Sequence, residues 1–150
     1  MMPVFLIAFI SACVSVLSAI AADSLLAERI SIIGSFAGLQ YTLNPGVAFG
    51  ITFPPLLQVS LIAIALLAVI WMARGVRDRT EAIAYGLVLG GGIANIVDRL
   101  PDGVVTDYFQ IGTFPVFNVA DSCITVGVFL LLLEMIVGRR AKMKDESGKS

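Results

Sequence analysis

The chain of 150 residues is 58% hydrophobic and only 14% charged, whereas soluble domains are about 45–50% apolar and about 25% charged. A soluble fold of this length cannot bury so much apolar surface, and intrinsic disorder requires the opposite composition. The formal net charge of −1 argues against nucleic acid as a partner, and the absence of histidine removes Ser-His-Asp and Cys-His catalysis and most catalytic zinc sites. Composition therefore predicts an integral membrane protein whose acid–base chemistry comes mainly from carboxylates.

Four apolar segments are long enough to cross a membrane. A hydrocarbon core of about 30 Å requires about 20 helical residues. The predicted spans are residues 3–22, 54–73, 82–98 and 121–138. We therefore expect an all-α membrane protein with four transmembrane helices in a single domain, residues 1–150.

The basic residues predict the orientation of these spans. Eight of the ten lie between spans two and three or after span four: Arg74, Arg77, Arg79, Arg139, Arg140, Lys142, Lys144 and Lys149. Cytoplasmic loops carry an excess of Lys and Arg. Both termini, the loop 74–81 and the tail 139–150 are therefore expected in the cytoplasm, and segments 23–53 and 99–120 on the outer side.

Residues 1–22 have an alternative interpretation as a cleaved signal peptide. Ala19-Ile20-Ala21 fits a small-x-small cleavage site. The first basic residue is Arg29, so the positive region that precedes the apolar part of a signal peptide is absent. This favours a retained first span, and the mass of the mature protein distinguishes the two.

The outward segment that follows the first span is too apolar for an ordinary loop. Large and small or polar side chains alternate over residues 36–43 and again over 47–53, on either side of Asn44-Pro45-Gly46. A period of two around a turn signal predicts a pair of short strands. We expect a small outward β element at the membrane surface, and the alternative is an irregular apolar linker.

Span three carries small residues at every fourth position. These are Ala82, Gly86, Gly90 and Ala94. Such a stripe allows a neighbouring helix to approach closely. We interpret it as a packing surface.

Acidic residues gather on the outer side. Five of the seven aspartates lie there: Asp23, Asp98, Asp102, Asp107 and Asp121. Ionisable groups at the edge of a membrane core are costly and are candidates for a functional site.

Each acid also has an ordinary structural interpretation. Asp98 can cap a helix end beside Arg99, Asp102 fits the turn Pro101-Asp102-Gly103, and Asp121 can be the N-cap of span four. Asp107 is the exception, because it lies among apolar neighbours where a carboxylate needs a partner.

Amide side chains accompany the acids at helical spacing. Asn95 precedes Asp98 by three residues and Arg99 by four, and Asn118 precedes Asp121 by three. These intervals bring side chains to one face of a helix. We expect Asp98 to support the site through Asn95 and Arg99.

Four motifs occur in an order that resembles a known family. They are Asn44-Pro45-Gly46-Val47-Ala48-Phe49, Asn95-Ile96-Val97-Asp98-Arg99, Gly103-Val104-Val105-Thr106-Asp107-Tyr108-Phe109 and Phe117-Asn118-Val119-Ala120-Asp121-Ser122. Together they resemble bacterial lipoprotein signal peptidase, also called signal peptidase II. The resemblance runs from Asp23 to the end of span four.

The resemblance implies an intramembrane aspartic peptidase of the bacterial cytoplasmic membrane. Its substrates are prolipoproteins whose lipobox cysteine carries a diacylglyceryl group, and cleavage falls just before that cysteine. Asp107 and Asp121 map to the catalytic pair. The positions that line or brace the site map to Asp23, Asn44, Gly46, Asn95, Asp98, Arg99 and Asn118. The family also implies an outward sheet that cradles the substrate. We expect a monomer in contact with membrane lipids, with no metal and no other cofactor.

The end of span one departs from the family pattern. Ser24 follows Asp23, and Ala27 stands where the family usually has lysine. This puts lysine-dependent positioning in doubt. Arg29 is a candidate for a partial substitute.

The implied chemistry is physically consistent. Two close carboxylates in a site of low dielectric cannot both ionise easily, so they share a proton and one acts as base while the other acts as acid. Such a pair titrates jointly, and the sequence does not assign the proton to either member. The alternatives are a proton- or cation-coupled transporter, which would place its acids near the bilayer midplane, and a non-catalytic scaffold, which would not explain Asp107.

Overall fold

The computed structural model describes residues 1–46, 54–76 and 78–147. Within them the chain forms four helices and three strands, in this order: α1 (Met2–Leu25), β1 (Ile30–Ile33), β2 (Ala37–Asn44), α2 (Pro55–Ala73), α3 (Arg79–Arg99), β3 (Val105–Ile111) and α4 (Val119–Ser147). Each helix contains a stretch that is long and apolar enough to cross a membrane. The predicted fold class, a four-helix membrane protein with a small sheet, is confirmed.

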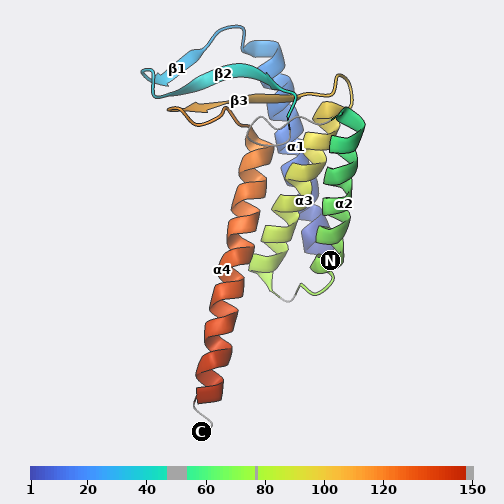
Figure 1. Cartoon of the computed structure of the whole chain (residues 1–150). Helices are drawn as coiled ribbons and strands as arrows, with labels where there is room; N and C mark the ends of the chain where they lie inside the picture. Colours follow the sequence, from blue (N-terminus) through green and yellow to red (C-terminus); the bar gives the residue numbers. More distant parts are fainter. Residues whose placement is uncertain (47–53, 77, 148–150) are drawn as a thin grey trace.

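Helix α3 is the centre of the bundle and contacts α1, α2 and α4 (Figure 1). A methyl group at Gly86 would lie 2.6 Å from Ile7 Cβ, and one at Gly90 would lie 2.5 Å from the carbonyl oxygen of Ala8. These clashes mean that only glycine allows α1 to lie this close. The interpretation of the small-residue stripe as a packing surface is confirmed.

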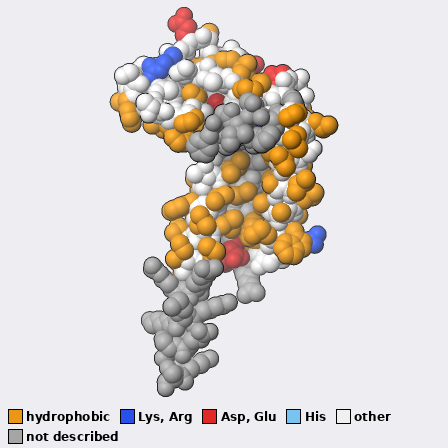
Figure 2. Space-filling view, viewed as in Figure 1, with side chains coloured by type: hydrophobic (Ala, Val, Ile, Leu, Met, Phe, Trp, Pro, Cys, Tyr) orange, Lys and Arg blue, Asp and Glu red, His pale blue; other side chains and the backbone are white. Residues whose placement is uncertain are grey.

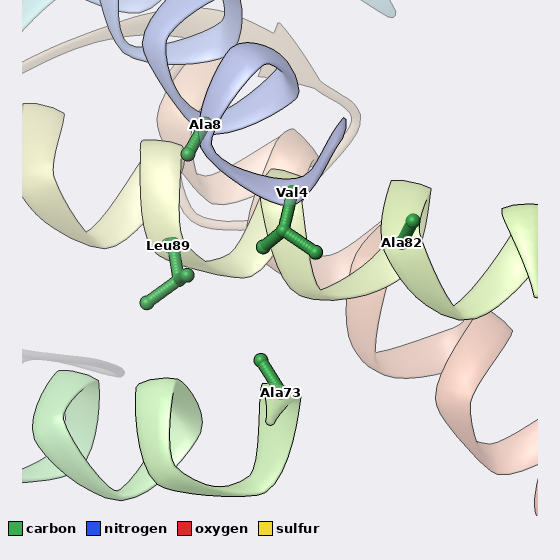
Figure 3. Close-up of a cluster of buried hydrophobic side chains, with 5 residues drawn as sticks. All are labelled: Val4, Ala8, Ala73, Ala82 and Leu89. Carbon is green, nitrogen blue, oxygen red and sulfur yellow. The ribbon is translucent and has the colours of Figure 1, made fainter. Parts of the chain in front are cut away.

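A cluster of apolar side chains fastens three helices together near the chain's N-terminus. Figure 3 shows Val4 and Ala8 of α1 against Ala82 and Leu89 of α3, with Ala73 of α2 beneath them. The outside of the bundle is also hydrophobic (Figure 2), and large side chains are well exposed there, such as Phe9 at 68% and Trp71 at 68%. A lipid environment accounts for this outer surface, because so large an exposed apolar surface is unfavourable in water.

The three strands form one antiparallel sheet in the order β1-β2-β3. The sheet lies across one end of the bundle and extends sideways beyond α4, whereas both chain termini lie at the opposite end (Figure 1). Strand β3 is the strand next to the bundle and contacts α1 and α3. Its residue Asp107 pairs in register with Thr42 of β2.

The predicted strands were only partly correct. The alternation over residues 36–43 corresponds to β2, while the second predicted strand, 47–53, lies outside the described residues. Strands β1 and β3 were not predicted. The first four residues of β3 are all buried, so this strand lacks the period of two that identifies a half-exposed strand.

Candidate active site

Asp107 is the most enclosed carboxylate of the site, and its side chain is 1% exposed. Two amides hold its two oxygens: Asn44 Nδ2 donates to Asp107 Oδ2 at 2.9 Å, and Asn118 Nδ2 donates to Asp107 Oδ1 at 3.0 Å. Asn44 closes strand β2 beside β3 in the sheet register. Pairing of the two strands therefore brings one donor, and the start of α4 brings the other.

Asp121 lies in the first turn of α4, but it is not the N-cap residue. Asn118 occupies the N-cap, because its Oδ1 accepts from the Asp121 backbone N–H at 2.8 Å. Asn95 of α3 donates from Nδ2 to Asp121 Oδ1 at 2.9 Å. The interpretation of Asp121 as the N-cap residue is thus wrong. Its Oδ1 is held by Asn95 of α3, and its Oδ2 accepts from the backbone N–H of the N-cap residue Asn118 at 3.4 Å.

Asn118, whose side chain is 4% exposed, links the Asp107 carboxylate to Asn95 and to the first turn of α4. Its amide nitrogen contacts Asp107, and the same nitrogen lies 3.3 Å from Asn95 Oδ1. Its amide oxygen caps the helix that carries Asp121. The amide can take only one orientation, since a flipped group would turn an acceptor toward a carboxylate. The spacing of the two acids is therefore built into this network of three asparagines.

The environment of Asp107 disfavours its charged form. The pKa of Asp107 is raised from 3.8 to about 6, mainly by burial. The nearby Asp121 charge also raises this pKa, while the hydrogen bond from Asn44 and the Arg99 charge lower it. Desolvation penalises the ionised carboxylate most. Asp107 therefore retains a proton to a higher pH than an ordinary aspartate.

Arg99 is only 5% exposed and supports the site through backbone contacts. Its Nη1 donates to the carbonyl oxygen of Asn95 at 3.1 Å, and its Nη2 donates to the carbonyl oxygen of Gly46. Gly46 in turn donates its backbone N–H to Asn44 Oδ1 at 2.9 Å. Through these backbone contacts Arg99 ties the end of α3 to the turn that follows β2, and so supports the amide that holds Asp107.

Asp98 has a contact with β3 that was not expected from the sequence. Its Oδ2 accepts a hydrogen bond from the backbone N–H of Thr106 at 2.7 Å. Thr106 immediately precedes Asp107 in β3. Asp98 therefore anchors the strand that carries Asp107, and it also interacts electrostatically with Arg99.

Asp23 lies at the outer end of α1 and has a tyrosine partner. The Tyr41 hydroxyl donates to Asp23 Oδ1 at 2.6 Å, and this bond is the main cause that raises the pKa of Tyr41 to about 12. Arg29 donates instead to Gln110 Oε1 at 2.8 Å and to two carbonyls of the β1–β2 turn. The idea that Arg29 substitutes for the family's lysine is therefore not supported within the described residues.

Asp102 is a turn residue, as the segment Pro101-Asp102-Gly103 predicts. It is exposed, and its Oδ1 accepts from the Val104 backbone N–H at 3.1 Å. This is the local hydrogen bond by which aspartate stabilises a turn. Asp102 therefore serves as a nearby control for the other acids.

A cavity of about 610 Å³ opens beside Asp121, bounded by residues of β2, α2, α3 and α4 and of the loop before α4. Its polar end carries Asp121 with Asn44, Asn95 and Arg99, whereas the rest is largely apolar, with Ile62, Phe117 and Ile124 among its walls. Ligand sites are commonly apolar clefts with a few converging polar groups. Among the described residues, no group of three His, Cys, Asp or Glu side chains is placed to hold a metal ion.

The sequence analysis did not single out two side chains, Tyr108 and Ser18, that lie beside the hydrogen-bond network of Asp107 and Asp121. Tyr108 follows Asp107 and is only 5% exposed, and its hydroxyl contacts Ser18 of α1 at 2.6 Å. A tyrosine in an otherwise apolar run was the available signal, since a buried hydroxyl needs a partner. Ser18 lay within a predicted span and carried no signal of its own.

Solved structures agree with the arrangement of helices and sheet. The chain superposes on a bacterial membrane enzyme solved at 2.3 Å resolution with a TM-score of 0.77 and 25% sequence identity, over 98% of this chain and 91% of that one. A second bacterial membrane enzyme, solved at 1.9 Å resolution, gives a TM-score of 0.75 at 24% identity and supports the fold alone.

Sequence comparison identifies the kind of enzyme. The family described as signal peptidase (SPase) II matches residues 6–137. The lipoprotein signal peptidase of Chlorobium luteolum is 40% identical over 121 residues, which cover 71% of this chain and 72% of that protein. The protein of the same name from Shouchella clausii is 40% identical over 124 residues, covering 78% and 81%.

The fold, the paired acids and these matches define the class: the protein is an aspartic peptidase of the membrane. Within that class, the chain belongs to the signal peptidase II family.

Proposed function

We propose that this protein removes the signal peptides of prolipoproteins whose cysteine carries a diacylglyceryl group, and that it cleaves immediately before that cysteine. The observation that carries the proposal is the network that joins the two acids: Asn118 Nδ2 donates to Asp107 Oδ1 at 3.0 Å and lies 3.3 Å from Asn95 Oδ1, while Asn95 Nδ2 donates to Asp121 Oδ1 at 2.9 Å. The names of the relatives, lipoprotein signal peptidases, support the substrate class. An aspartic mechanism needs two such carboxylates and no nucleophilic side chain.

The two acids divide the work of hydrolysis. One carboxylate takes a proton from a water molecule as the water oxygen adds to the scissile carbonyl carbon, and the other carboxyl gives its proton to the carbonyl oxygen. When the C–N bond then breaks, the proton held by the first group passes to the departing cysteine nitrogen, and the second group regains its proton from the collapsing diol. The products are a peptide carboxyl group and a free amino group on the lipidated cysteine. The raised pKa of Asp107 is suited to sharing a proton at the pH of the site.

The asparagines and Arg99 act as positioning residues in this scheme. Asn44, Asn95 and Asn118 each donate to a carboxylate oxygen, so the acids keep their orientation through the cycle. Fixing the orientation of reacting groups raises the rate substantially, because their translational and rotational entropy is already lost before the chemical step. Asp98 acts one step further out by holding β3, and Asp23 holds the sheet through Tyr41.

The membrane supplies part of the substrate binding. A diacylglyceryl group partitions into lipid by about 0.8 kcal/mol per buried CH₂, so the scissile bond arrives at the depth of the lipid interface. The apolar part of the cavity beside Asp121 suits the hydrophobic residues of a signal peptide. The sheet at this end of the bundle is the surface that would meet the segment beyond the cysteine (Figure 1).

The proposed orientation places the sheet and the carboxylates outside the bacterial cytoplasmic membrane and both termini in the cytoplasm. Two features support it: both chain termini lie on the side of the bundle away from the sheet (Figure 1), and eight of the ten basic residues fall in segments 74–80 and 139–150. We propose that the single domain works as a monomer and needs no metal.

A cleavage assay tests the function directly. Purified protein in lipid nanodiscs is given one prolipoprotein in two forms, with and without the diacylglyceryl group, and the products are weighed by mass spectrometry. The lipidated form should yield a mature fragment beginning at the modified cysteine. Cleavage at another bond, or equal cleavage of the unlipidated form, would contradict the proposal.

Membership of a peptidase family leaves the two alternative functions, a coupled transporter and a non-catalytic scaffold, without support.

A further inference from the structure

A chain of hydrogen bonds connects the two helices on either side of β3. The backbone N–H of Val119, the first residue of α4, donates to the Tyr108 hydroxyl oxygen at 3.3 Å. Tyr108 donates its own proton to Ser18 Oγ at 2.6 Å, and Ser18 donates to the Ser15 carbonyl oxygen at 2.8 Å. Every hydroxyl in this chain both donates and accepts, so each bond polarises the next.

The position of Tyr108 makes this chain relevant to the two acids. Tyr108 is bonded covalently to Asp107, and Val119 lies two residues before Asp121. The Tyr108 side chain is only 5% exposed, so its hydroxyl cannot exchange its protein partners for water without cost. Loss of the hydroxyl would leave β3 and the start of α4 joined there through Asn118, but it would remove the hydrogen bond that links Tyr108 to Ser18 of α1.

We propose, on the basis of the proposed function, that Tyr108 and Ser18 are positioning residues that hold Asp107 and Asp121 in place relative to the bundle by tying β3 and the first turn of α4 to helix α1. Neither residue touches the reacting atoms. Asn118 determines how the two acids face one another, and the hydroxyl chain holds that pair in place relative to the bundle and its cavity.

The test compares cleavage by purified wild type, Tyr108→Phe, Ser18→Ala and the double variant, with the lipidated prolipoprotein as substrate. Each single variant should lower kcat about tenfold, as expected for one lost hydrogen bond acting on the transition state, and leave KM within about twofold. Both changes break one chain, so the double variant should be no slower than the slower single variant. Ser18→Thr retains the hydroxyl and should restore kcat.

Two matched variants control for general effects of removing a hydroxyl. Ser24→Ala removes an exposed serine of the same helix, which donates to the Ile20 carbonyl oxygen at 2.7 Å, and Tyr85→Phe removes a half-buried tyrosine hydroxyl toward the other end of the bundle. Both should keep wild-type kcat. If Tyr108→Phe does not fold, Ser18→Ala breaks the same chain without changing the ring.

The outcomes separate this proposal from the proposed function. Wild-type kcat in Ser18→Ala, multiplicative losses in the double variant, or failure of Ser18→Thr to restore the rate would overturn the positioning role while wild-type cleavage stands. Absence of cleavage by the folded wild type would instead overturn the function.

Discussion

Asn118 Nδ2 donates to Asp107 Oδ1 at 3.0 Å while the Oδ1 of the same amide caps the helix that begins at the next residue. A single side chain thereby sets the start of α4, which carries Asp121, against the strand that carries Asp107. Helix capping and the geometry of the candidate active site depend on the same residue, and substitutions can separate the two roles.

The two carboxylates should be equally indispensable. Asp107→Asn and Asp121→Asn should each nearly abolish cleavage of a lipidated prolipoprotein, because asparagine retains the size but cannot exchange a proton. The double variant should be no worse than either single variant, since the pair acts as a unit. Rates are measured with purified, folded, membrane-inserted protein.

Substitutions of two neighbouring acids, Asp102 and Asp98, provide the comparison for that experiment. Asp102→Asn should be nearly as active as wild type, because Asp102 only stabilises a turn. Asp98→Asn should be intermediate, because Asp98 holds the Thr106 N–H beside the site. Substantial turnover by Asp107→Asn, or a loss in Asp102→Asn as large as that in Asp121→Asn, would show that the pair is wrongly assigned.

Asn118→Ser should separate capping from positioning. Serine is a good N-cap, so α4 should keep most of the roughly 1 kcal/mol that a cap contributes. The shorter side chain cannot donate to Asp107, so kcat should fall about tenfold or more. Thermal unfolding in detergent and cleavage kinetics are measured on the same preparation. An equal loss of stability and activity would indicate that Asn118 is only a cap.

The ionisation of Asp107 should appear in the pH dependence of stability. Burial raises its pKa from 3.8 to about 6, so the folded state holds this proton more tightly than the unfolded state does. The resulting stability is complete below pH 3.8 and is lost as the pH rises through about 6. Relative to Asp107→Asn, wild type should therefore lose stability over this interval. Parallel unfolding curves for the two proteins between these pH values would count against a raised pKa.

Chelation should leave the enzyme active. The mechanism uses two carboxylates and water, and the chain has no histidine. Cleavage is compared before and after dialysis against EDTA, with a metalloprotease as a positive control for chelation. Complete loss of activity that a divalent ion restores would contradict the two-aspartate mechanism.

The orientation can be tested with reporters. A reporter fused after residue 76 or residue 147 should behave as cytoplasmic, and one at residue 104 should behave as exported, because basic residues favour the cytoplasmic side. Labelling of single cysteines in intact cells provides an independent measurement. A cytoplasmic reporter at residue 104 would overturn the proposed four-span arrangement.

Several features of this protein followed from the sequence alone. Long apolar segments indicated four spans, because helix length and hydrocarbon thickness are linked by simple geometry. The stripe at Gly86 and Gly90 indicated close helix packing, because a helix repeats its faces about every four residues. The alternation over 36–43 indicated a strand, because successive side chains of a strand point to opposite faces of a sheet. All of these are periodic or additive properties that can be counted along a chain.

The tertiary structure alone decided how the polar residues are partnered. The sequence placed Asn95 near Asp98 by helical spacing, yet Asn95 binds Asp121 and Asp98 binds the backbone of Thr106. Strand β3, Tyr41 beside Asp23, and the link from Tyr108 to Ser18 were not predicted from the sequence. These contacts join residues far apart in the chain, and a hydrogen bond forms only where donor and acceptor meet within about 3 Å. Local patterns do not specify such distances, because the packing of helices and strands against one another determines them.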